Sequence, residues 1–147
     1  MNYNNSEVLQ DLSCIFCNIV VGKATAYRIY EDDHTIAFLD ISPISRGHTL
    51  VITKSHYKNI IEIPKEGILP LFSTVKKVAT MIKSRLNSDG LNIGINDGKV
   101  AGQVVFHLHV HIIPRNIDDD VNFERRIIED PEELDSVMKN ILNKPKT

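Results

Sequence analysis

The sequence predicts an α+β domain with a mainly antiparallel sheet. Short apolar, β-branched runs separated by tight turns predict the strands, and one long segment with apolar residues at three- and four-residue steps predicts the main helix. The chain of 147 residues is about the length of one domain, and no repeat or long linker divides it. We therefore expect one domain over residues 13–142, with flexible ends at 1–12 and 143–147.

The first half of the chain predicts three strands. Residues 26–31 and 35–40 read as a hairpin, because Asp32 and Asp33 between them are turn residues. The run 48–53 follows Gly47 and is short, apolar and β-branched, which is typical of a buried strand.

Pro64 precedes a predicted helix, whose periodic part covers residues 69–86. Its apolar positions recur at three- and four-residue steps: Leu71, Phe72, Val75, Val78, Ala79, Ile82 and Leu86. After a stop at Gly90, residues 91–96 and 104–113 alternate as strands, the second ended by Pro114. Pro131 favours the start of a last short helix, which runs to about Leu142.

The composition excludes several classes of protein. The chain is 42% hydrophobic and 24% charged, as globular proteins are, and its net charge of −2 lacks the basic excess of a nucleic-acid-binding protein. No apolar run reaches the roughly 20 residues that span a bilayer, and no secretory signal opens the sequence. We expect a cytoplasmic protein with no nucleic-acid or membrane partner. A small anionic ligand remains possible, because it needs only a local site.

Three histidines alternate with apolar residues at His107, His109 and His111. On a strand they share one face, while Leu108 and the apolar residues after it face the core. The outer two are roughly 13 Å apart along a strand, too far to share one ion with short zinc–nitrogen bonds. The histidines therefore divide their work, and a neutral imidazole can attack phosphorus near pH 7.

The loop before these histidines predicts an anion site. Residues 96–103 contain Gly98 and Gly102, which let backbone N–H groups approach a ligand, together with the amide of Gln103. Because the loop leads directly into the histidines, it indicates phosphate binding beside a nucleophile.

Cys14 and Cys17 form a Cys-x-x-Cys pair. From the residues alone the pair is a redox pair, an inert apolar pair or half of a zinc site. A tetrahedral zinc would need two more ligands, for which His56 and one of the three alternating histidines are candidates.

The ordered motifs resemble the histidine-triad (HIT) superfamily. Residues 107–113 match its His-φ-His-φ-His-φ-φ signature, where φ is apolar, and the resemblance runs from about Ser13 to Arg115. It includes Cys-x-x-Cys, the stretch 37–43, Gly47-His48, Lys54-Ser55-His56 and Ala101-Gly102-Gln103. It implies a five-stranded antiparallel sheet with one long and one short helix, a homodimer, and nucleotide hydrolysis or nucleotidyl transfer at the α-phosphate.

The resemblance also implies roles for individual residues. His109 is the expected nucleophile, with the His107 carbonyl orienting its other nitrogen, and His111 and His48 assist at the phosphate. Gln103 supports the leaving group. The expected nucleotide-binding residues, besides His109 and His111, are Ile15, Phe16, Ile19, Phe38 and Ile41 around the base, Asp40 on the ribose, Asn96, and Gly102, Gln103 and Val104 on the phosphate.

In members that keep Cys-x-x-Cys, the resemblance points to the first triad histidine as a metal ligand. The expected structural zinc site is Cys14, Cys17, His56 and His107, with no organic cofactor. One departure concerns Val104, which stands where the purine phosphoramidase branch has serine. The choice between that branch and dinucleoside polyphosphate hydrolases stays open.

We therefore expect an enzyme that attacks the α-phosphate of nucleoside phosphoramidates or dinucleoside polyphosphates. It would pass through a nucleotidyl-histidine and release a nucleoside monophosphate, with a purine nucleotide as substrate. Two alternatives remain, a zinc-dependent phosphohydrolase and a nucleotide-binding regulator with little turnover.

Overall fold

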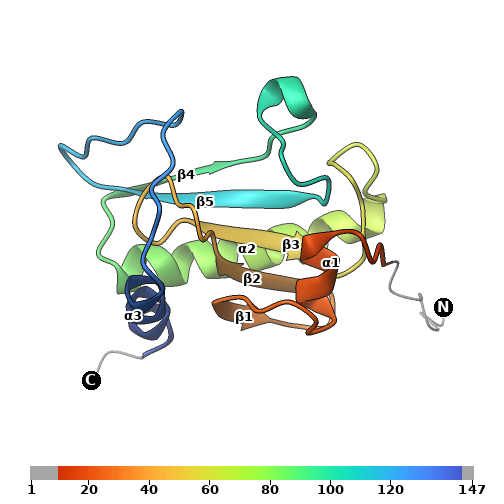
Figure 1. Cartoon of the computed structure of the whole chain (residues 1–147), viewed down its shortest axis with the longest axis horizontal. Helices are drawn as coiled ribbons and strands as arrows, with labels where there is room; N and C mark the ends of the chain where they lie inside the picture. Colours follow the sequence, from red (N-terminus) through yellow and green to blue (C-terminus); the bar gives the residue numbers. More distant parts are fainter. Residues whose placement is uncertain (1–9, 144–147) are drawn as a thin grey trace.

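A five-stranded antiparallel sheet forms the centre of the molecule (Figure 1). The structure, a computed structural model, describes residues 10–143. The strand order is β1-β2-β3-β5-β4, and every neighbouring pair is antiparallel. In chain order the elements are α1 (Ile15–Val20), β1 (Arg28–Glu31), β2 (Thr35–Leu39), β3 (Thr49–Thr53), α2 (Lys65–Arg85), β4 (Gly90–Gly94), the 3-10 turn η1 (Lys99–Ala101), β5 (His109–Arg115) and α3 (Pro131–Leu142). The predicted fold class is confirmed.

Helices cover both faces of the central strands. Alternation along β2 sends Ala37 and Leu39 to the side of α2 and α3, and Ile36 and Phe38 to the side of α1. The helix α2 contacts β2, β3 and β5, and α3 packs on α2 and β1 at one end of the sheet (Figure 1). Because both faces are covered, all five residues of β2 and of β3 are buried.

The histidine strand is shorter at its start than predicted. The prediction began it at Val104, whereas β5 begins at His109, so His107 lies in a bend before the strand. The partner strand β3 pairs only with His109 to Ile112, and the residue before His109 is bonded elsewhere, since Leu108 N–H donates to the Tyr57 carbonyl at 2.7 Å. Leu108, Val110 and Ile112 nevertheless pack in the core as expected.

The predicted end of this strand at Pro114 was wrong. β5 continues to Arg115, and Pro114 lies opposite Leu91 of β4. The Pro114 carbonyl accepts a hydrogen bond from Ser45 Oγ at 2.7 Å, and Ser45 lies just before the first residue of β3. The N and C=O of one strand residue point to the same side, so the missing N–H costs no bond to β4.

One helix differs from the prediction. The residues after Cys14 form α1, a helix that was not predicted, whereas α2 begins at Lys65, directly after Pro64 as expected. Lys65 and Glu66 are exposed, so the apolar periodicity starts only after the first turn of α2. The last helix begins and ends where predicted, with Asp130 capping it through a hydrogen bond from Glu132 N–H.

The two expected flexible ends fall largely on residues 1–9 and 144–147, outside the described residues. Within 10–143, no helix has the length and apolar character needed to cross a membrane. The cytoplasmic location and the lack of a nucleic-acid partner stay predictions.

Candidate active site and metal centre

The sheet and α1 bring Cys14, Cys17, His56 and His107 together. One ligand atom from each residue lies within 4.8 Å of all the others. The Nδ1 atom of His56 is 3.2 Å from Cys17 Sγ and 3.2 Å from His107 Nδ1, and both sulfurs are 3.5 Å from His107 Nδ1. Tetrahedral zinc with ordinary Zn–S and Zn–N bonds separates its ligand atoms by about 3.3–3.8 Å. The four residues therefore fit a structural zinc ion.

Hydrogen bonds behind the ligands orient their lone pairs. His107 Nε2 donates to the Thr53 carbonyl at 2.7 Å, which leaves the Nδ1 lone pair facing the cluster. The Cys17 sulfur accepts from Asp11 N–H at 3.3 Å, and the Cys14 sulfur accepts from Cys17 N–H at 3.5 Å. Burial raises the pKa of the Cys17 thiol to about 11 in the absence of a metal, the opposite of a redox-active cysteine. These features favour the metal interpretation of the pair.

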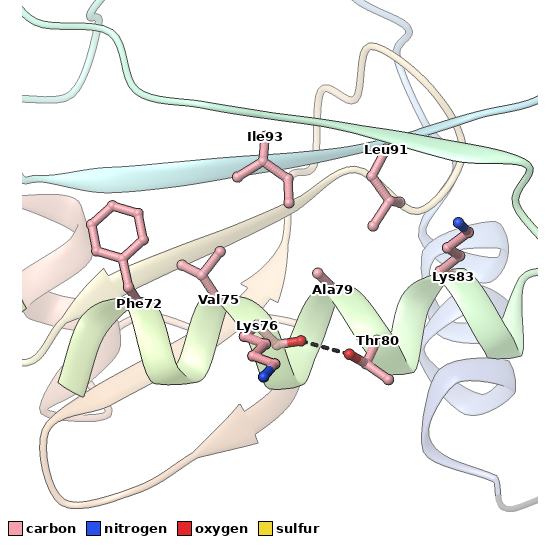
Figure 2. A pocket seen from close by; sticks show the side chains of 8 residues that line it. All are labelled: Phe72, Val75, Lys76, Ala79, Thr80, Lys83, Leu91 and Ile93. Carbon is pink, nitrogen blue, oxygen red and sulfur yellow. Dashed lines mark hydrogen bonds between the residues drawn. The ribbon is translucent and has the colours of Figure 1, made fainter. Parts of the chain in front are cut away.

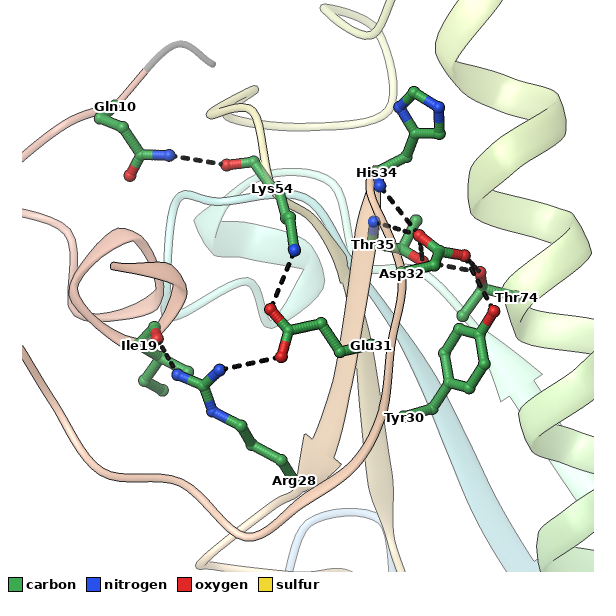
Figure 3. A network of polar contacts seen from close by, with 10 residues as sticks. All are labelled: Gln10, Ile19, Arg28, Tyr30, Glu31, Asp32, His34, Thr35, Lys54 and Thr74. Carbon is green, nitrogen blue, oxygen red and sulfur yellow. Dashed lines mark hydrogen bonds and ion pairs between the residues drawn. The ribbon is translucent and has the colours of Figure 1, made fainter. Parts of the chain in front are cut away.

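Polar contacts fasten the helix that carries the cysteines to the sheet (Figure 3). Arg28 of β1 donates to the Ile19 carbonyl in α1 and to the Glu31 carboxylate. Glu31 also pairs with Lys54 at 2.9 Å, just beyond β3. These contacts link the last turns of α1 to β1 and to the end of β3.

His109 lies beside the metal cluster, with its reactive nitrogen defined by its neighbour. The Nδ1 atom is 2.6 Å from the His107 carbonyl oxygen, which can only accept, so Nδ1 carries the proton and Nε2 the lone pair. The ring packs edge-on against Phe16, with centroids 5.2 Å apart. Burial lowers the pKa of His109, although the hydrogen bond to the His107 carbonyl opposes this effect. The imidazole is therefore neutral at pH 7 and able to act as a nucleophile.

His48 and His111 form a second hydrogen-bonded chain. Ile44 N–H donates to His48 Nδ1 at 3.0 Å, so the His48 proton is on Nε2, which lies 2.9 Å from His111 Nδ1. His111 therefore carries its own proton on Nε2, and this buried atom has no hydrogen-bond partner among the described residues. Burial lowers the pKa of His48 to about 3 and that of His111 to about 4. The chain ends in an unsatisfied donor next to His109, whose ring centroid is 4.9 Å from that of His111.

Asp40 joins the second chain together with an arginine that sequence reasoning did not select. The Asp40 carboxylate lies 3.7 Å from His48 Nε2 and accepts from Ser42 N–H at 2.9 Å and from Arg126 Nη1 at 2.9 Å. Arg126 is 86 positions further along the chain, in a mixed charge run that resembles an ordinary exposed loop. No motif spacing signals this contact.

The glycine loop is braced by Gln103. Its side chain is buried, donates to the Lys58 and Val105 carbonyls at 2.6 and 3.2 Å, and accepts from Gly98 N–H at 2.9 Å. The Gln103 side-chain amide, which was expected to support a leaving group, thus makes its hydrogen bonds within the protein. Gly98 and Gly102 both have positive φ, and a side chain at Gly102 would lie 3.3 Å from the Asn96 amide nitrogen.

The expected base-binding residues divide into two sets. Phe16 and Ile19 of α1 are buried in one apolar cluster with Phe38 of β2. Ile15 and Ile41 are instead 50% and 65% exposed. Val104 is 83% exposed, and it has no side-chain hydroxyl.

The fold and the histidine arrangement define a histidine-triad protein. Residues 21–118 match the HIT domain, which is two thirds of the chain, and the protein belongs to the HIT domain family.

Its relatives include an uncharacterized HIT-like protein of Saccharolobus solfataricus, which is 50% identical over 101 residues, or 69% of this chain and 73% of that protein. Adenylylsulfatase HINT3 of Arabidopsis thaliana is 40% identical over 114 residues, covering 78% of this chain and 57% of that protein. A crystal structure of a Zn-bound histidine triad family protein from Mycobacterium smegmatis superposes with a TM-score of 0.80 and 41% identity, covering 89% of this chain and 91% of that one.

Proposed function

We propose that the protein is a nucleotide hydrolase or nucleotidyl transferase that attacks the α-phosphate through His109. The observation that carries the proposal is the bond from His109 Nδ1 to the His107 carbonyl, which presents a neutral Nε2 lone pair next to the unpartnered His111 Nε2–H. A nucleophile and a hydrogen-bond donor for a phosphoryl oxygen therefore lie side by side.

The reaction proceeds in two displacements. His109 Nε2 forms a bond to the α-phosphorus while the bond to the leaving group breaks, and the leaving group departs with the electron pair and takes a proton from solvent. The His107 carbonyl stabilises the resulting imidazolium through Nδ1–H. Water then attacks phosphorus and loses a proton to solvent, the P–N bond breaks with its electron pair returning to His109 Nε2, and a nucleoside monophosphate and neutral His109 are released.

The proposed substrates are nucleoside phosphoramidates and dinucleoside polyphosphates. Adenylyl sulfate joins them, because a relative that is 40% identical is named an adenylylsulfatase. All three are purine nucleotide conjugates with a leaving group on the α-phosphate, which is the atom that a single nucleophile and donor pair can address.

We also propose a structural zinc ion on Cys14, Cys17, His56 and His107. The 3.2–3.5 Å spacings of the ligand atoms and the Zn-bound relative support it. By coordinating both cysteines and His107, zinc would link α1 to the segment before β5. These residues would thus hold the His107 carbonyl in place behind His109.

One observation favours the zinc-dependent phosphohydrolase as a second candidate. Asp40, His48 and His111 place ligand atoms within 4.8 Å of one another. However, the Asp40 carboxylate is already paired with the Arg126 guanidinium, whose positive charge opposes a cation, and His48 Nε2 and His111 Nδ1 are bonded to each other. Attack by His109 therefore remains the better-supported function.

We propose that the protein works as a homodimer joined through α2 and β4. The outer edge of β4 has no strand partner within residues 10–143, and Figure 2 shows Leu91 and Ile93 of β4 facing the side chains of α2. They line a groove of about 420 Å³ with Phe72, Val75 and Ala79. An unpaired edge beside half-exposed apolar side chains is a favourable surface for a second copy.

Replacing His109 tests the proposed activity. His109→Ala should lower turnover of adenosine phosphoramidate by at least about 10³-fold, since the Nε2 lone pair proposed to attack phosphorus is lost. The control is His34→Ala, at an exposed histidine in the β1–β2 turn. Turnover that persists in His109→Ala but disappears on chelation, with the fold intact, would support the zinc-dependent alternative instead.

A further inference from the structure

Three hydrogen bonds hold the segment around Arg126 beside Asp40, whose carboxylate lies 3.7 Å from His48 Nε2. Its Nη1 atom donates to the Asp40 carboxylate at 2.9 Å and to the Ser42 carbonyl at 3.0 Å. The next residue is fixed as well, because Ile127 N–H donates to the Pro43 carbonyl at 2.8 Å. The segment after β5 thus returns to the 40–43 loop, at the end of β2 that approaches His48.

Most of the guanidinium is left without a partner. Both hydrogen bonds of Arg126 use Nη1, and the Nε and Nη2 donors make none among the described residues. The side chain is 40% exposed, whereas Asp40 is 14% exposed. The Nε and Nη2 donors of Arg126 are therefore available to bind a second anion beside the Asp40 carboxylate.

The histidines next to Asp40 and Arg126 offer an anion no full positive charge. Burial lowers the pKa of His48 to about 3 and that of His111 to about 4, and the nearby Arg126 charge contributes to both shifts. These two imidazoles are therefore neutral at pH 7, while the guanidinium remains charged. A phosphoryl group bound beside His111 would meet the charge of Arg126.

A purely structural role explains these contacts less well. The Asp40 carboxylate already accepts from Ser42 N–H, which closes its turn without the arginine. A half-exposed ion pair contributes only about 0–1 kcal/mol to stability. Arg126 also lies outside residues 21–118, the part of the chain that matches the HIT domain.

We propose that Arg126 is a substrate-binding residue whose guanidinium binds the phosphoryl group of the nucleotide, with Asp40 holding it beside the triad. The inference rests on the proposed function and extends it, since it assigns the recognition of phosphate charge to a residue outside the family's motifs. It predicts a preference for nucleotides over nucleosides that depends on one side chain.

The test compares 5′-AMP with adenosine in titrations followed by NMR, which also measures weak binding. Arg126→Met should weaken 5′-AMP about tenfold or more, the cost of a lost charge-assisted hydrogen bond, and leave adenosine within about twofold. Arg126→Lys keeps the charge and should retain part of the preference. The matched control is Arg125→Met, whose side chain pairs with exposed Asp120 instead and should bind as the wild type does.

Three results would overturn the inference. Equal weakening of both ligands would make Arg126 a brace for Asp40, tighter binding of both would make it an obstruction, and unchanged binding would exclude any role. If the wild-type protein turns over adenosine phosphoramidate while one of these results is found, only the inference fails. If it neither binds 5′-AMP nor turns over any conjugate, the proposed function fails with it.

Discussion

At the scale of single residues, backbone groups decide what each histidine can do. The His107 carbonyl gives His109 a free Nε2 lone pair, and Ile44 N–H gives His111 a free Nε2–H, through His48. Two similar imidazoles thus become an acceptor and a donor. The difference comes from one fixed hydrogen bond behind each ring and not from the side chains themselves.

The buried second chain predicts a pH-dependent stability. The pKa values of His48 and His111 are about 3 and 4 in the folded protein, against about 6.5 for an unfolded histidine. Between about pH 6 and pH 4 the unfolded chain takes up protons that the folded chain does not. The free energy of unfolding should therefore decrease as the pH is lowered, by up to about 1.4 kcal/mol per pH unit for each histidine. Above pH 7 this loss should be absent.

Urea unfolding of the wild type and of His111→Asn at constant zinc would measure this effect. The variant has one such histidine fewer, so its stability should depend less steeply on pH in the same range. Identical slopes in the two proteins would show that His111 does not resist protonation in the folded state.

At the scale of elements, the hydrophobic pattern predicted most of the sheet. The strands β2, β3 and β4 lie within one or two residues of the expected ranges, because apolar and β-branched runs between turn residues are typical of strands. The start of β5 was misplaced because the apolar residues continue back to Val104, whereas pairing with β3 begins only at His109. Pairing partners are a tertiary property that a local pattern does not contain.

The contact between Asp40 and Arg126 shows the same limit at the site. Asp40 lies in a recognisable stretch, but Arg126 approaches it only because the segment after β5 folds back to Pro43. Likewise, the spacing of the histidines predicted that they divide their work, whereas the tautomers needed the positions of Thr53 and Ile44.

The element that carries the proposed dimer contact can be changed without touching the triad. Ile93→Lys places a charge on the exposed side chain of edge strand β4 and should convert a dimer to monomers, because a buried unpaired lysine in the interface is unfavourable. Sedimentation measures the mass. The control is Ile128→Lys, at another exposed isoleucine away from the groove, which should stay dimeric. A monomeric wild type, or an unaffected Ile93→Lys, would contradict the proposal.

At the scale of the whole molecule, the cysteine and histidine cluster lies between the short helix α1 and the segment before β5. If zinc occupies it, removal by a chelator should lower the melting temperature by about 10 °C, because a tightly bound ion stabilises only the folded state. A Cys14→Ser and Cys17→Ser double variant should not respond to the chelator. Equal melting temperatures with and without chelator, and no zinc in the purified reduced protein, would contradict the proposed zinc site.

The central claim is that His109 becomes covalently attached to the nucleotide. The most direct measurement is to incubate the protein with α-labelled adenosine phosphoramidate, quench the reaction rapidly, and locate the label by peptide mapping. We expect an acid-labile adenylyl group on His109, absent in His109→Ala and present in His34→Ala. Label on another residue, or turnover that is undiminished in His109→Ala, would contradict it.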